Sequence, residues 1–176
     1  MRFADFLRTA VLLFLGAATA CAAVTIAAAQ ADDNTTLLYV AFGWWIVAAG
    51  LGLFLGRGAV AGIDHLVADA RTSQTLPEVQ PGRIIVNRLW ALLLASVVAG
   101  GLAVVIPQVP AMAAGFFLLA ALWWRRQPAA VSAIEERDGV RFYVERTSPF
   151  EPTKLVRTPG FRRNEPAPTD VQHTAR

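Results

Sequence analysis

The chain has 176 residues, of which 55% are hydrophobic and only 16% are charged. An ordinary soluble domain is about 45–50% apolar and about 25% charged, so this composition indicates a membrane protein rather than a larger soluble core. The single cysteine, Cys21, excludes an internal disulfide, a Cys-x-x-Cys redox pair and a multi-cysteine metal site.

The first apolar segment, residues 9–29, contains 21 residues without a charge. A bilayer core about 30 Å thick needs roughly 20 helical residues, so the segment is long enough to cross it. The region also resembles an export signal, because Ala29-Gln30-Ala31 fits signal peptidase and AATAC resembles a lipoprotein box ending at Cys21. The apolar region of a cleaved signal is usually only about 7–15 residues long. We therefore expect residues 1–31 to be retained as an anchor, with a cleaved signal as the alternative.

Three further apolar segments follow, at residues 37–56, 89–106 and 109–124. The last is short, but Pro110 is tolerated in the first turn of a helix, and tilt and the snorkelling of Arg125 and Arg126 can absorb the mismatch. We predict four transmembrane helices. The alternative is a re-entrant hairpin formed by the last two segments, because their turn, PQVP, carries no charge to fix it in water.

The basic residues are distributed on one side of this four-span arrangement. All 16 precede the first segment, lie in the loop 57–88 or follow the fourth segment, whereas QADDNTT and PQVP contain none. Lys and Arg are enriched in cytoplasmic loops, so both termini and the loop 57–88 are predicted to be cytoplasmic. Lys154 is the only lysine, and this preference for arginine with abundant alanine suggests a bacterium. The expected location is a bacterial plasma membrane, crossed several times.

Small residues four apart occur in three of the segments, a spacing that lets helices approach closely in lipid. These candidate helix-packing pairs are Gly52 and Gly56, Ser96 and Gly100, and Ala111 and Gly115. They can form a homo-oligomer interface, but packing among the chain's own helices is the favoured interpretation. The segment interiors carry no Asp, Glu, Lys, Arg or His, which argues against an active transporter.

The loop begins with a predicted amphipathic helix at residues 57–71, whose apolar side chains fall within one arc of a helical wheel. Its two aspartates favour packing against protein over binding to anionic lipid. His65 and Asp69 share a face, but two side chains are too few for a metal site. We assign no catalytic, cofactor-binding or metal-binding residue and expect the chain not to be an enzyme.

The tail, residues 127–176, contains a hairpin signal. Asp138-Gly139 suits a two-residue turn with positive φ, which predicts a hairpin over residues 131–146, although its first arm could instead extend the fourth helix. A lone hairpin is marginal in water, so a third strand is expected, with residues 153–158 as the candidate. The end of the tail, residues 163–176, is expected to be disordered.

Several apolar side chains lie among the prolines and charges of this tail. Those predicted to dock a protein partner are Phe142, Phe150, Leu155, Val156 and Phe161. Sheet augmentation of a partner would use them, and so would covering of the hairpin itself, so the two interpretations stay open. The charges of the tail are too balanced for nucleic-acid binding.

These observations predict an all-α integral membrane protein with four transmembrane helices in residues 1–126, a short cytoplasmic amphipathic helix and a small C-terminal hairpin. The expected function is that of a non-catalytic accessory, scaffold or assembly subunit in the lipid bilayer. A small transporter or channel subunit that acts as an oligomer is the alternative.

Overall fold

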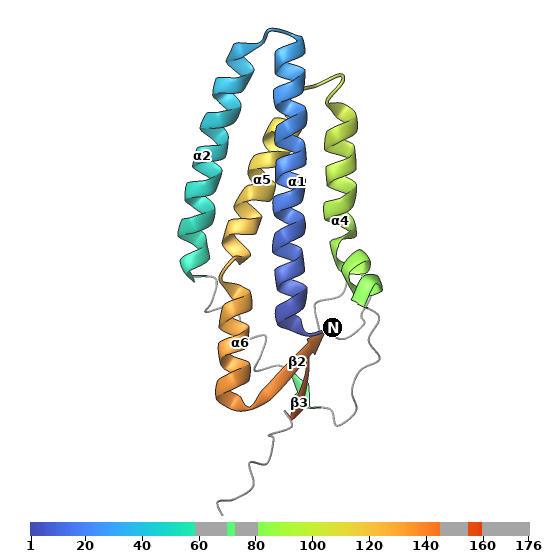
Figure 1. The fold of residues 1–176 in the computed structure, drawn as a ribbon, viewed down its shortest axis with the longest axis vertical. Coiled ribbons are helices and arrows are strands. Elements are labelled where there is room, and N and C mark those ends of the chain that lie inside the picture. Colours follow the sequence, from blue (N-terminus) through green and yellow to red (C-terminus); the bar gives the residue numbers. More distant parts are fainter. Residues whose placement is uncertain (59–69, 73–80, 145–154, 160–176) are drawn as a thin grey trace, which may run out of the picture.

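A computed structural model describes residues 1–58, 70–72, 81–144 and 155–159. The chain is mostly helical, and four long helices lie side by side with a small sheet below one end of them (Figure 1). In chain order the elements are α1 Phe3–Ala31, α2 Thr35–Gly58, β1 Arg71–Thr72, α4 Pro81–Leu102, α5 Gln108–Trp124, α6 Gln127–Asp138, β2 Val140–Val144 and β3 Leu155–Pro159.

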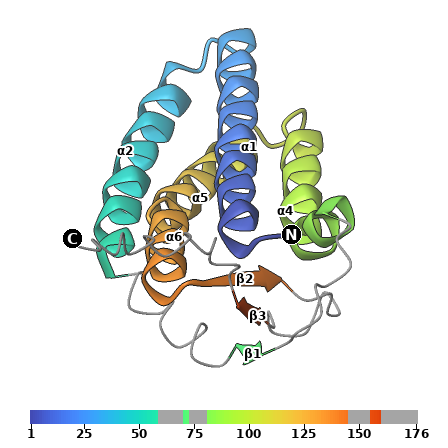
Figure 2. The same ribbon diagram turned by 60° about the horizontal axis from the view of Figure 1, so that its bottom comes forward.

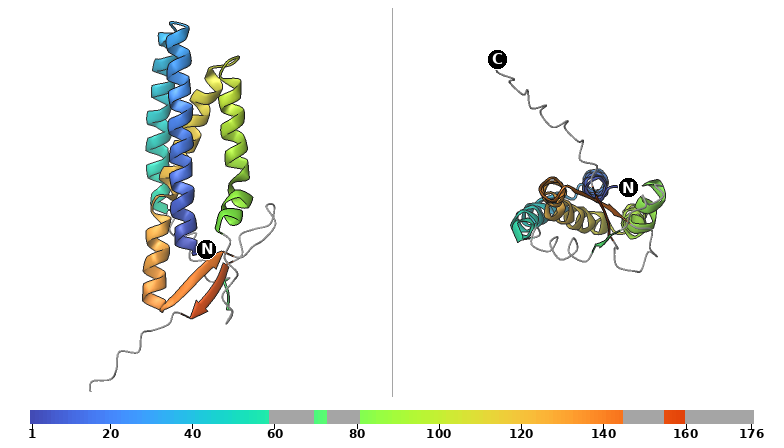
Figure 3. Two further views of the ribbon diagram at one scale, coloured as in Figure 1. Left: turned by 45° about the vertical axis from the view of Figure 1, so that its right-hand side comes forward. Right: turned by 90° about the horizontal axis from the view of Figure 1, so that it is seen from below.

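Helices α1 and α5 form the centre of the bundle. The view from below places α2 and α4 on opposite flanks of this pair (Figure 3, right). Helix α5 packs mainly against α1 and α2, while α4 packs against both α1 and α5. The buried residues between α1, α4 and α5 include Cys21, Leu89, Leu92 and Phe117, which are the main contacts of the bundle core.

A tight turn joins α1 to α2. Asp33 adopts a positive φ of 48°, a conformation that short polar residues tolerate better than others. Asn34 then caps α2, because its side-chain oxygen accepts a hydrogen bond from the backbone N–H of Leu37 at 3.0 Å. This turn makes α1 and α2 antiparallel neighbours, as a short helix–helix connection requires.

Two described helices are long and apolar enough to cross a membrane, namely α1 and α2, and both lie near the N-terminus. Helix α4 has a shorter apolar part, Leu89–Leu102, and α5 has 17 residues. The third predicted segment was expected to run to Ile106, but its helix ends at Leu102, just after Gly100 and Gly101. Adjacent glycines weaken a helix because they lose the most backbone entropy on ordering. Most of the predicted amphipathic helix at 57–71 lies outside the described residues.

The predicted hairpin over residues 131–146 is wrong in its first arm. Residues 127–138 form α6, which begins with Pro128 in its first turn and ends at Gly139, in the left-handed conformation with φ 63°. Positive φ at this glycine was predicted, but it serves as a helix C-cap rather than as a hairpin turn. The missing N–H of Pro128 also removes the hydrogen bond that would continue α5 into α6, so the two helices are separate.

The sheet forms from parts of the chain that are distant in sequence. It has three strands in the order β1-β3-β2. Strand β3 confirms the predicted third strand and pairs antiparallel with β2, with Tyr143 opposite Val156. The two-residue β1, from the loop between α2 and α4, pairs parallel with β3 and places Arg71 opposite Val156. Figure 2 shows all three strands below the helices.

Candidate functional site

The tail forms a sheet-end core with the first turns of α1. We use this name for the buried cluster built from α1, α6, β2 and β3, which comprises Phe3, Ala4, Phe6, Leu7, Val131, Val140, Phe142, Val144 and Leu155. Phe142 and Val131 are fully buried, each with 0% of its surface exposed. Because one wall of this core belongs to α1, the sheet is not a separate domain on a linker.

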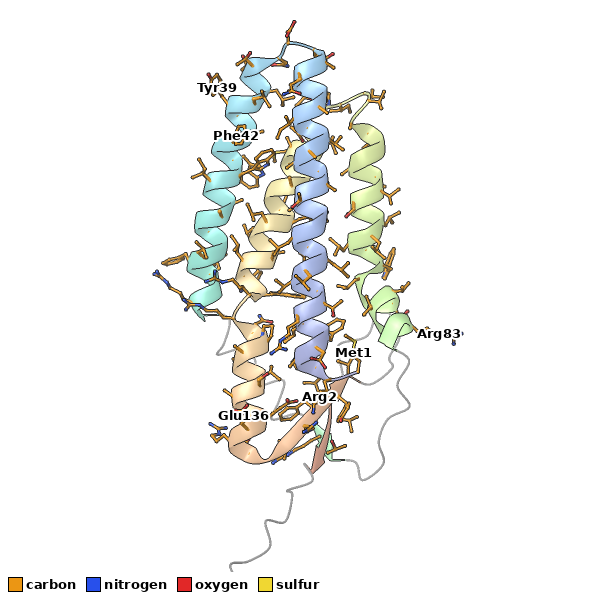
Figure 4. The ribbon with its side chains drawn as sticks, in the orientation of Figure 1. Met1, Arg2, Tyr39, Phe42, Arg83 and Glu136 are labelled. Atoms are coloured by element: carbon orange, nitrogen blue, oxygen red, sulfur yellow. The ribbon has the colours of Figure 1, made fainter. Side chains whose placement is uncertain are left out.

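The outer edge of β2 is closed by the same elements. The backbone N–H of Phe142 donates to Oε1 of Glu135 on α6 at 2.9 Å. The backbone N–H of Val144 donates to the carbonyl oxygen of Met1 at 3.1 Å, and Arg2 forms an antiparallel bridge with Tyr143. Figure 4 shows Met1 and Arg2 beside this strand. An unpaired strand edge is a template for pairing with another chain, and here that edge is occupied.

Three of the predicted docking residues belong to the protein's own interior. Phe142, Leu155 and Val156 are all buried, so they are not available to a partner in this conformation. The sequence left two uses open for these side chains, docking of a partner or covering of the chain's own tail. In the structure Phe142 and Leu155 lie in the cluster that α1 and α6 help to form, which agrees with the second use. Phe150 and Phe161, the other two predicted docking residues, lie outside the described residues.

A charged pair lies on the surface of α6 at its C-terminus. Nε of Arg137 donates to Oδ1 of Asp138 at 2.9 Å. This hydrogen bond, with smaller electrostatic contributions from Arg137 and Arg157, lowers the pKa of the Asp138 carboxyl. Exposed ion pairs contribute little to stability, so the pair is a surface feature rather than a site.

The small residues of α2 form a close helix-packing site with α5. A Cβ atom added at Gly52 would lie 2.8 Å from the carbonyl oxygen of Leu119 and 2.9 Å from Cβ of Leu122. One added at Gly56 would lie 2.9 Å from the carbonyl oxygen of Leu122 and 3.2 Å from that of Trp123. Backbone atoms cannot rotate away, so only glycine permits this approach. The structure therefore places this pair inside the chain's own bundle.

Two tryptophans join the same helices nearer to the α1–α2 turn. The indole N–H of Trp45 donates to the carbonyl oxygen of Ala111 at 2.9 Å, and that of Trp44 donates to Met112 at 3.2 Å. A Cβ atom at Gly115 would overlap the indole ring of Trp44. The Ala111 and Gly115 pair thus packs against α2, where glycine provides the space that the indole fills.

The remaining predicted pair, Ser96 and Gly100, is not used in this way. The hydroxyl of Ser96 donates to the carbonyl oxygen of Leu92 at 2.8 Å, and a Cβ at Gly100 would meet no atom within 4 Å. Thr19 and Thr25 also donate to the carbonyl one turn earlier, at 2.9 and 2.8 Å. These polar groups in the apolar helices therefore have local backbone partners.

No chemical site emerges from the described part of the chain. Within it, no group of three or more His, Cys, Asp or Glu residues could hold a metal ion. His65 and Asp69 lie outside it. No protein-family model, curated protein sequence or solved structure matches the chain.

Proposed function

We propose that the protein is an integral membrane protein whose four long helices, α1, α2, α4 and α5, lie within the bilayer. The main support is the apolar surface of the bundle. Large apolar side chains are exposed on each of these helices, among them Leu12, Tyr39, Phe42, Ile46, Phe54, Leu93, Val97, Met112 and Phe116. Soluble monomers rarely expose contiguous apolar patches larger than a few hundred Å², so lipid is the natural covering for such a surface.

The charges of the two ends support an orientation with the sheet in the cytoplasm. Arg83, on the first turn of α4, lies at the sheet end of the bundle, and Arg57, in the last turn of α2, also follows the apolar part of its helix (Figure 4). Asp32 and Asp33 are exposed at the opposite end. Cytoplasmic loops are rich in Lys and Arg, so the basic end is assigned to the cytoplasm of a bacterium.

Retention of the first helix is part of this proposal. Phe3, Phe6 and Leu7 fill the sheet-end core, and Ala10, Ala18 and Cys21 lie in the bundle core. Removal of residues 1–31 would leave both cores without one wall. Burial of each large side chain contributes about 1.5–3 kcal/mol, so such a loss would be severe.

We further propose that the protein is a non-catalytic scaffold or accessory subunit whose sheet presents a docking segment to a cytoplasmic protein. One observation carries this idea. The sheet is attached to α1 through the sheet-end core, with the outer edge of β2 closed by Met1 and Glu135. It therefore forms a fixed support for the chain between β2 and β3, which contains Phe150, and for the chain after β3, which contains Phe161.

The test compares partner capture by variants that leave the core intact. Phe150→Asp and Phe161→Asp should each reduce recovery of a co-purifying protein from detergent-solubilised membranes, because a charge in an apolar anchor pocket is costly. Glu136→Gln is the control, since this side chain projects from α6 away from the sheet (Figure 4). Equal recovery of the same proteins by all three variants would show that these phenylalanines are not docking anchors.

A further inference from the structure

The connection between α4 and α5 is unusually apolar for an exposed turn. The side chains of Val104, Val105 and Ile106 are 92%, 77% and 45% exposed. The next residues are Pro107 and Gln108, and no charged residue lies anywhere between Arg88 and Arg125. A turn in water is normally built from polar residues and glycine, and it does not present three successive β-branched side chains to solvent.

Three backbone N–H groups of this connection donate to carbonyl oxygens at the end of α4. The N–H of Ala103 donates to the carbonyl oxygen of Gly100 at 3.3 Å, and those of Val105 and Ile106 donate to Leu102 at 3.1 and 2.7 Å. Pro107 has no N–H to satisfy. Each unsatisfied backbone group in hydrocarbon costs several kcal/mol, so these three hydrogen bonds lower the free-energy cost of placing the turn in lipid.

The position of the connection also differs from that of the α1–α2 turn. Figures 1 and 3 show it nearer to the sheet end along the long axis of the molecule. Helix α5 has 17 residues and, at about 1.5 Å per residue, covers roughly 26 Å. A hydrocarbon core of about 30 Å is longer than this, so α5 falls short of the plane that α1 reaches with its 29 residues.

We propose that the connection, residues 103–107, is embedded in the lipid of the leaflet opposite the sheet. The proposal rests on the membrane insertion proposed above, and it states where in the bilayer the turn between α4 and α5 lies. Lipid acyl chains cover Val104, Val105 and Ile106, and the exposed amide of Gln108 lies at the level of the lipid esters. The α1–α2 turn, with Asp32 and Asp33, instead reaches water.

The test measures the surroundings of single spin labels on the full chain, with Cys21→Ala as the background, in liposomes of phosphatidylcholine and phosphatidylglycerol. Labels at Val105→Cys, Val97→Cys and Asp32→Cys are compared for collision with oxygen, which concentrates in lipid, and with a water-soluble nickel complex. The label in the α1–α2 turn replaces Asp32 rather than Asn34, because the side chain of Asn34 caps α2. Val97 is 72% exposed on α4 and serves as the lipid-facing reference.

The expected result is that the oxygen-to-nickel collision ratio at Val105 matches that at Val97 and greatly exceeds that at Asp32. A ratio at Val105 as low as that at Asp32, with Val97 still high, would overturn the embedded turn but leave membrane insertion intact. Low ratios at both Val97 and Val105 would overturn the proposed insertion itself. Protection of Val105 from both reagents would also overturn the proposal, because protein rather than lipid would then cover the turn.

Discussion

Gly52→Ala and Gly50→Ala form a matched pair that tests the close packing of α2 against α5. Both glycines lie in the interior of α2, so both replacements gain about 0.5–1 kcal/mol of helix propensity. A Cβ at Gly50 would meet no atom within 4 Å, whereas one at Gly52 would lie 2.8 Å from the carbonyl oxygen of Leu119. The difference between the variants therefore isolates the contact between the helices.

The magnitude follows from how far the helices must separate. Ordinary contact begins near 3.4 Å, so the distance to Leu119 must increase by about 0.6 Å from its 2.8 Å. That displacement also strains the indole hydrogen bonds of Trp44 and Trp45, which join the same two helices. Overpacking of this kind typically costs about 1–3 kcal/mol. Gly50→Ala should be neutral or slightly stabilising, and Gly52→Ala should be less stable than Gly50→Ala by about 1–3 kcal/mol.

The assay is unfolding of the purified protein in mixed micelles of a mild detergent and increasing dodecyl sulfate. Helix content is followed by circular dichroism, and tryptophan fluorescence reports the α2–α5 contact. The free-energy difference comes from the shift of the unfolding midpoint, provided that the slopes agree. Equal midpoints for the two variants would refute the packing argument, because the added methyl group at Gly52 would then have found space.

The other predictions concern the sheet-end core and α6. Phe142→Ala should destabilise this core by about 3–5 kcal/mol and speed proteolysis of the tail, because Phe142 is fully buried. Tyr143→Ala is the control and should have a smaller effect, since Tyr143 is only half-buried. Equal rates of proteolysis in the two variants would contradict the assigned core. Gly139→Val should lower the stability of the tail by at least about 1–2 kcal/mol, because the left-handed conformation of Gly139 disfavours L-residues. Proteolysis of the tail should therefore be faster, and an unchanged rate of proteolysis would contradict the helix C-cap. Asp138 should titrate below the usual carboxyl pKa by NMR, and Arg137→Gln should raise that pKa. Since the folded-state pKa is lowered, the associated stabilisation is present above the unfolded pKa and is lost as the pH falls through the folded value.

The apolar segments could be predicted from the sequence because a long run without charges has few other solutions. The strand at residues 155–159 could also be predicted, because the apolar side chains of Leu155 and Val156 require an apolar surface to pack against. The Asp138-Gly139 signal was ambiguous, because positive φ suits both a hairpin turn and a helix C-cap. Residues 127–138 form a helix because Val131 and Ile134 then pack against the core. This contact depends on tertiary structure, so the local sequence does not predict it.

Contacts between segments that are distant in the sequence could not be predicted from the sequence. The pairing of Met1 with Val144 joins residues that are far apart in the sequence, and no local pattern near either residue predicts it. The contact of Trp44 with Gly115 also depends on how α2 and α5 are positioned relative to each other along the bundle axis. Small-residue spacing therefore identified the faces of α2 and α5, but it predicted the same role for Ser96 and Gly100, which the structure does not use.

The two cores of the molecule are joined by α1 and by the end of α5. Trp124 packs against both the sheet-end core and the bundle core, and its ring contacts Phe14 edge-on with centroids 5.6 Å apart. Since α1 also forms a wall of each core, the sheet cannot rotate freely about the α5–α6 break. Trp124 and α1 therefore connect the packing of the sheet to the packing of the helices.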